Sequence, residues 1–190
     1  MKNLPKNLLG RPFSWTEAKS SGMTQYALRQ FLSSGIIERI ARGVYRTTLD
    51  VDLSPEDQFK SALLRVGQPS AICLISALAF HHLTDVIPKK TWVMASAEKI
   101  TNQKDIRVFR RRNPKWHIGI EVIDGLKITN VERTLLECLY YKDLAGGAAF
   151  AVSAIRLALH EKKTTMSDLL KMSKKLGLEK RILPYLEALS

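Results

Sequence analysis

Three side chains on one short segment have the chemistry needed to read DNA bases. Gln25, Arg29 and Gln30 lie in the stretch TQYALRQFLSSG, which begins at Thr24 and ends at Gly35. In the major groove, glutamine pairs bidentately with adenine, and arginine does so with guanine. The first residues of a recognition helix face the base edges, so Thr24 belongs to the same set. These residue types predict direct readout of duplex DNA.

A second set of side chains has the chemistry for phosphate contacts. Arg39, Arg42 and Arg46 lie in ERIARGVYR, where basic and apolar residues alternate around Gly43. Such alternation with a glycine at the turn is typical of a two-stranded ribbon. Arginines on a ribbon would contact backbone phosphates or the minor groove and raise affinity for any duplex. The alternative is a surface hairpin without a ligand.

Two helices must position these residues. Ser14 and Glu17 have the spacing of a capping box, which predicts a helix that ends at the turn of residues 20–22. Thr24 then caps a second helix, which Gly35 ends before the ribbon begins. Three side chains of the second helix are expected to pack against the preceding helix and against a short helix predicted for residues 4–9: Tyr26, Leu28 and Phe31.

The order helix, turn, helix, hairpin is that of a winged helix-turn-helix, which we assign to residues 1–50. Lys and Arg outnumber Asp and Glu there by eight to three, in a chain whose net charge is +12. A basic surplus favours an anionic partner. A small helical bundle with an exposed hairpin would have the same elements without binding DNA, and this alternative stays open.

Residues 54–190 are predicted to form a second, mixed domain. Ser54 and Pro55 form a strong helix start, and residues 67–88 follow as a turn and a buried helix. From residue 131 the pattern is helical again. Three stretches alternate or are apolar and predict a small sheet: residues 91–96, 106–111 and 118–129. The fold class is therefore α+β, an N-terminal winged helix-turn-helix followed by a mixed α/β domain with a small sheet and C-terminal helices.

The second domain contains one concentrated basic segment, RVFRRRNPKWH. Functionally, it could hold a DNA backbone, RNA or an acidic partner. Structurally, it could be a solvated edge strand, because charges there prevent unwanted strand pairing. Its five cations are Arg107, Arg110, Arg111, Arg112 and Lys115.

The histidines and the strand carboxylates do not form a recognisable catalytic or metal set. His81 and His82 are adjacent, so on a helix they would not face one ion. Glu121, Asp124 and Lys127 do not have the spacing of a magnesium-dependent nuclease core, and Asp124 belongs to a predicted hairpin turn. We therefore predict no catalytic site, no metal and no cofactor.

Cys73 and Cys138 lie in apolar surroundings, which favours buried thiols in a reducing compartment. The start of the chain has no long apolar stretch, and the apolar segment 71–80 is too short to span a bilayer. These features predict a cytoplasmic protein that does not bind membranes.

Three segments in this order resemble the AbiEi family of antitoxins from bacterial type IV toxin–antitoxin systems: RGVYR, ISALAFHHL and GLKITNVERTLLECL. The resemblance extends over residues 14–145. It implies a winged-helix DNA-binding domain, a C-terminal domain needed for antitoxin action, and repression of the protein's own promoter. It also implies that the protein counteracts a nucleotidyltransferase-like toxin without a stable complex. At Glu137 the family pattern leads us to expect aspartate.

Two other function classes remain open. One is a nucleic-acid-processing enzyme targeted by the winged helix, which would cleave duplex DNA with magnesium. The other is a stand-alone regulator whose second domain senses a ligand, in which case no toxin gene would lie beside its own.

Overall fold

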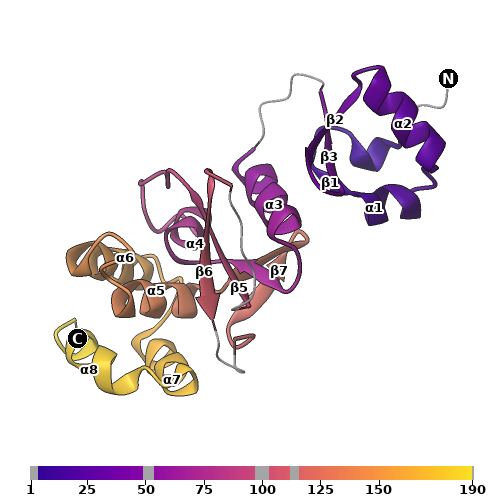
Figure 1. Cartoon of the computed structure of the whole chain (residues 1–190). Helices are drawn as coiled ribbons and strands as arrows, with labels where there is room; N and C mark the ends of the chain where they lie inside the picture. Colours follow the sequence, from indigo (N-terminus) through magenta and orange to yellow (C-terminus); the bar gives the residue numbers. More distant parts are fainter. Residues whose placement is uncertain (1–3, 49–53, 97–102, 112–115, 190) are drawn as a thin grey trace. The chain divides into compact units, whose positions relative to one another are not determined.

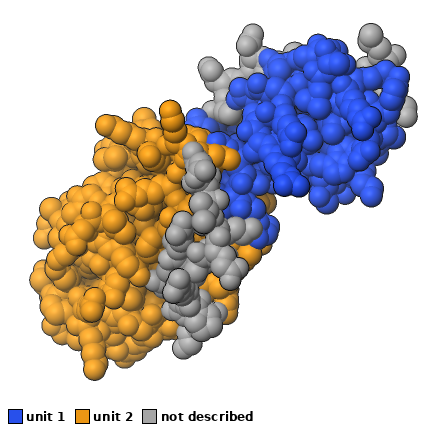
Figure 2. Space-filling view, in the orientation of Figure 1, with its two compact units in different colours: residues 1–68 blue, residues 69–190 orange. Residues whose placement is uncertain are grey.

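The chain divides into two compact units, residues 1–68 and 69–190 (Figure 2). Each unit has its own sheet and its own buried apolar core. The α+β fold class predicted from the sequence is therefore confirmed. The computed structural model describes residues 4–48, 54–96, 103–111 and 116–189.

Unit 1 has a three-stranded antiparallel sheet with the strand order β1-β3-β2 (Figure 1). Its elements are η1 Lys6–Leu8, β1 Phe13–Ser14, α1 Trp15–Ser20, α2 Gln25–Ser33, β2 Ile37–Ala41, β3 Val44–Thr47 and α3 Pro55–Val66. The predicted order of helix, turn, helix and hairpin is present. Strand β1 was not predicted, because two residues are too few to show an alternating pattern.

Both predicted helix starts are present. The Ser14 hydroxyl accepts a hydrogen bond from the Glu17 backbone N–H at 3.1 Å, and the Glu17 carboxylate accepts one from the Ser14 N–H at 2.7 Å. This is the reciprocal capping box. The Thr24 hydroxyl accepts from the Ala27 N–H at 3.2 Å and so caps α2. These caps fix where each helix begins and hence which side chains it turns outward.

The core of unit 1 lies between its helices and one face of its sheet. Leu28 and Phe31 of α2 are buried there, as predicted, and the rings of Phe13 and Tyr45 lie 6.0 Å apart. The prediction for Tyr26 is wrong, because its side chain is 71% exposed. Two residues correspond to about 200° of helix rotation. Tyr26 therefore points away from the core that Leu28 enters.

Helix α3 is grouped with unit 1, whereas the sequence assigned it to a domain of residues 54–190. It lies against β1 and β3. Val44 alternates with Tyr45, so its side chain is on the sheet face opposite the core just described, yet it is only 4% exposed. We infer that α3, which contacts β1 and β3, shields the Val44 face of the sheet from solvent. The expected boundary, between residues 50 and 54, lies outside the described residues.

Unit 2 has a five-stranded mixed sheet with the order β6-β5-β4-β8-β7. Pairs β4–β8 and β5–β6 are parallel, and pairs β4–β5 and β7–β8 are antiparallel. The strands are β4 Ser70–Ile72, β5 Thr91–Ser96, β6 Ile106–Arg111, β7 Ile120–Ile123 and β8 Leu126–Thr129. Asp124 and Gly125 have φ values of 48° and 77°, which confirms the predicted hairpin turn. The central strand β4 was not predicted: it lies within residues 67–88, which were predicted as a turn and a buried helix, because a run of three buried residues has no readable period.

The helices of unit 2 form a layer in which α5 contacts α4, α6, α7 and α8 (Figure 1). Their bounds are α4 Leu74–Phe80, α5 Val131–Tyr140, α6 Ala148–His160, α7 Met166–Leu176 and α8 Glu179–Glu187. Both cysteines, Cys73 and Cys138, are fully buried, as predicted. Burial raises the pKa of the Cys138 thiol well above its ordinary value.

A fully buried ion pair lies inside unit 2. The Arg133 guanidinium is 3.1 Å from Glu137 Oε1, one helical turn further along α5. It also donates to the backbone carbonyls of Trp116 and Ile118. Glu137, where the AbiEi pattern led us to expect aspartate, is thus the acidic partner of Arg133. The pair ties the segment before β7 to α5.

Candidate nucleic-acid interface

Helix α2 is amphipathic and turns one polar face to solvent. Ala27, Leu28 and Phe31 are buried on the opposite side. At about 100° per residue, the exposed side chains fall within an arc of about 140°. They are Gln25, Tyr26, Arg29, Gln30 and Ser33. The three base-reading side chains predicted from the sequence are therefore exposed on one helix face.

Thr24 precedes this face at the N-cap of α2. Its side chain is exposed, but its hydroxyl oxygen already accepts the hydrogen bond from Ala27. The hydroxyl proton can still be donated. Thr24 therefore caps α2, and its hydroxyl can form a hydrogen bond with DNA only as a donor or through its second lone pair.

Tyr26 also lies on this face, although its sequence position did not make it a candidate DNA contact. Gln30 Nε2 donates a hydrogen bond to Tyr26 Oη at 2.9 Å, one helical turn away. The second N–H of that amide and its carbonyl oxygen remain available, which is what bidentate pairing with adenine requires. The phenol thus orients Gln30 without blocking it. Its spacing of four residues from Gln30 is the signal that could have identified it.

The ribbon arginines do not form one row. Residues directly opposite in an antiparallel pair have side chains on the same face. Arg39 is opposite Tyr45 and therefore lies on the core side of the sheet, where it is exposed at the edge. Arg46 is opposite Glu38, on the other face. The register shift between Arg39 and Ala41 causes this, because the Ala41–Val44 register, if continued, would place Arg39 opposite Arg46.

The charge of Arg46 is matched by a carboxylate. Its Nε forms an ion pair with Glu38 Oε1, and both side chains are partly exposed. Arg42 lies in the turn and is exposed, beside Gly43 with φ 72°. The positive φ at Gly43 confirms the predicted turn glycine. Of the three arginines, Arg39 and Arg42 are therefore the better placed to meet phosphates.

The second predicted basic patch is described only in part. Arg107 lies on β6, an edge strand of the sheet, with its guanidinium 4.4 Å from the ring centroid of Trp92. Arg110 and Arg111 follow on β6, paired through their backbone with β5. Arg112 and Lys115 lie outside the described residues. That these cations bind a ligand together stays a prediction, and so does the alternative that they only prevent the edge strand β6 from pairing with another strand.

The residues considered for catalysis lie apart. Glu121 is opposite Ile128 and Lys127 is opposite Val122, so the two side chains point to opposite faces of the hairpin. The ring of His81 lies 2.7 Å from the Thr129 carbonyl oxygen, and burial lowers its pKa. Within the described residues, no group of three or more His, Cys, Asp or Glu side chains is arranged to hold a metal ion.

Comparisons with known proteins agree with this geometry. The chain resembles in fold the crystal structure of the RV2827C protein from Mycobacterium tuberculosis, with a TM-score of 0.57 and 14% sequence identity. The likeness covers 86% of this chain and 66% of that one, so the chain spans just under two thirds of that protein. A search of curated proteins found no match. Among the described residues, no helix has the length and apolar character that crossing a membrane requires.

The N-terminal segment matches a family model. Residues 8–48, which include α1, α2 and the β2–β3 hairpin, match the model described as "Transcriptional regulator, AbiEi antitoxin". The matched segment carries every residue predicted to read bases and all three ribbon arginines. Residues 8–48 are therefore identified as a transcriptional-regulator domain of the AbiEi antitoxin type.

Proposed function

We propose that this protein is a sequence-specific repressor of its own promoter and the antitoxin of a type IV toxin–antitoxin operon. The observation that carries the proposal is the exposed face of α2, with Gln25, Arg29 and Gln30, inside a segment that matches an AbiEi regulator model. In this proposal the second partner is a nucleotidyltransferase-like toxin, which the protein counteracts without a stable complex.

The arrangement of unit 1 supports insertion of α2 into the major groove. Arg29 would pair with guanine and Gln30 with adenine, and each bidentate pair is worth about 1–3 kcal/mol of discrimination. Tyr26, held by Gln30, adds an apolar ring surface that suits a thymine methyl group. Arg39 and Arg42 would add phosphate contacts that increase affinity without reading sequence.

Unit 2 would supply the antitoxin action, and we propose no enzymatic step for it. The opposite orientation of Glu121 and Lys127 supports this, since a nuclease core needs its acidic and basic groups around one metal. The two fully buried thiols, Cys73 and Cys138, support a reducing, cytoplasmic setting.

Two readouts in cells test the proposal. A reporter behind the protein's own promoter measures repression, and growth during expression of the neighbouring gene measures antitoxin action. The double variant Gln25→Ala, Arg29→Ala should lose repression but still restore growth, because both residues lie in unit 1. Full repression by the variant would contradict the DNA-reading role of α2. A neighbouring gene whose product does not slow growth would contradict the antitoxin role.

A further inference from the structure

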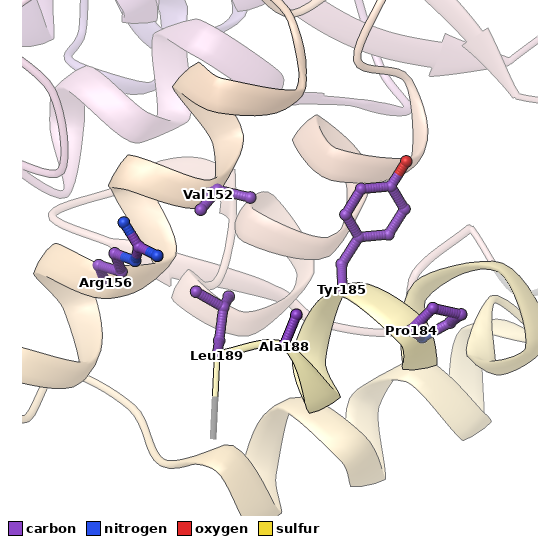
Figure 3. Close-up of a pocket in the computed structure, with 6 residues that line it drawn as sticks. All are labelled: Val152, Arg156, Pro184, Tyr185, Ala188 and Leu189. Atoms are coloured by element: carbon purple, nitrogen blue, oxygen red, sulfur yellow. The ribbon is translucent and has the colours of Figure 1, made fainter.

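A small open pocket lies between α6 and the end of α8 in unit 2 (Figure 3). Its volume is about 220 Å³. Pockets that bind drug-sized molecules have volumes of about 300–1,000 Å³, so this one suits one or two amino-acid side chains. It is lined by Val152, Arg156, Pro184, Tyr185, Ala188 and Leu189.

The chemistry of the lining defines what fits. The lining is apolar except for Arg156 and Tyr185, and the Tyr185 hydroxyl accepts a hydrogen bond from Lys142 Nζ at 3.0 Å. Arg156 is exposed and makes no ion pair with any described residue. An apolar hollow with an arginine at its rim is complementary to an apolar side chain next to a carboxylate.

The loop between α4 and β5 of the same unit carries exposed apolar side chains next to a carboxylate. Ile87 is 89% exposed, the largest exposure among the big apolar side chains of the described residues, and Val86 is 50% exposed. Asp85 precedes them and is also exposed. Because Ile87 is in solvent while the pocket is open, one copy does not fill its own pocket. Adjacent exposed apolar side chains of this kind mark an interaction site.

The loop is held in place before any partner arrives. Leu83 is buried, and the Thr84 hydroxyl accepts from the Val86 N–H at 3.1 Å. Lys163 Nζ donates to the carbonyl oxygens of His81 and His82, at 2.8 and 3.3 Å. A preorganised loop loses little conformational entropy on binding.

We propose that the Val86–Ile87 tip of one copy of this chain enters the α6–α8 pocket of a second copy, with Asp85 of the first beside Arg156 of the second. The contact is heterologous, because the tip and the pocket are different surfaces. In such a pair, the copy that contributes its tip keeps a free pocket, and the copy that contributes its pocket keeps a free tip. In the proposed head-to-tail arrangement these free surfaces bind further copies, so the average mass increases with concentration in the absence of DNA.

Sedimentation velocity of the full chain without DNA, over a wide range of concentrations, tests the contact. The average mass should rise with concentration, and Ile87→Asp should weaken association by about tenfold or more. Val122→Asp is the matched control, since Val122 is another exposed apolar side chain, 62% exposed on β7. It should leave association unchanged. A mass that does not vary with concentration, or equal weakening by both variants, would overturn the proposal.

Charge reversal and mixing test the identity of the two surfaces. Asp85→Arg and Arg156→Asp should each weaken association, and the double variant should restore it. Ile87→Asp removes the tip and keeps the pocket, whereas Ala188→Trp fills the pocket and keeps the tip. A mixture of the two variants should form one-to-one pairs and no larger species. Failure of the double variant to restore association, or continued growth in the mixture, would refute a head-to-tail contact.

Discussion

The salt dependence of DNA binding distinguishes the three ribbon arginines from one another. Each phosphate that a cation neutralises contributes about −0.9 to the slope of log K against log salt concentration. Three unpaired arginines on one wing would together contribute about −2.7. In the structure, however, Arg46 is paired with Glu38 on the sheet face opposite Arg39. Two arginines, Arg39 and Arg42, therefore remain for phosphates.

Substitution of these residues gives three different expectations. The double variant Arg39→Ala, Arg42→Ala should flatten the slope by up to about 1.8. Arg46→Ala should change it by much less, because Glu38 already compensates that charge. Glu38→Gln should steepen the slope by up to about 0.9, since it releases Arg46.

Fluorescence anisotropy of labelled promoter DNA, titrated with each variant at several KCl concentrations, measures these slopes. The ratio of affinities for promoter and random DNA should stay nearly constant in all variants, because phosphates are the same in every sequence. Equal slopes for Arg46→Ala and for the double variant would refute the role that we assign to the ion pair. An unchanged slope in the double variant would mean that the ribbon is a surface hairpin without a ligand.

Three further predictions concern stability and organisation. Arg133→Met removes the charged partner of the buried Glu137 and should lower the free energy of unfolding of unit 2 by about 3–5 kcal/mol in chemical denaturation. Lys171→Met, in an exposed ion pair, is the control and should lower it by less than about 0.5 kcal/mol. Similar losses in the two variants would contradict a stabilising role of the buried pair. Burial alone would raise the pKa of Glu17, but hydrogen bonds from Ser14 and Arg11 outweigh the effect of burial and lower the pKa. Its stabilising effect is thus present above the ordinary glutamate pKa and is lost as pH falls through the lowered value, so thermal melts of Glu17→Gln should depend less on pH below about pH 5 than those of the wild type. A fragment of residues 69–190 should fold by circular dichroism and lose promoter binding, and tight binding by the fragment would contradict the assignment of DNA binding to unit 1.

Local signals in the sequence were sufficient for the helices of unit 1. The capping box of α1, the Thr24 cap of α2 and the glycines act within a few residues, so the starts of α1 and α2 and the turn at Gly43 follow directly from residue types. Short strands carry no such signal. β1 and β4 have two and three residues, and each exists because a neighbouring strand supplies its hydrogen bonds.

The candidate site was predictable in composition but not in geometry. The exposure of Gln25 and Arg29 follows from the helical period. The two faces of the ribbon do not follow from the alternation of arginines, because the register shift after Arg39 reverses the sense of alternation. The Glu38–Arg46 pair depends on that register and was therefore not predicted from sequence.

Sequence reading by α2 can be measured as a difference in affinity between two DNAs. Anisotropy titrations should compare the protein's own promoter with a scrambled duplex of the same length and composition. Gln25→Ala and Arg29→Ala should each reduce the ratio of the two affinities by a factor that corresponds to about 1–3 kcal/mol, while binding to the scrambled duplex changes much less. Lys19→Ala, an exposed cation on α1, serves as the control and should leave the ratio unchanged. An equal loss of affinity for both duplexes, or no loss for either, would contradict sequence reading by α2.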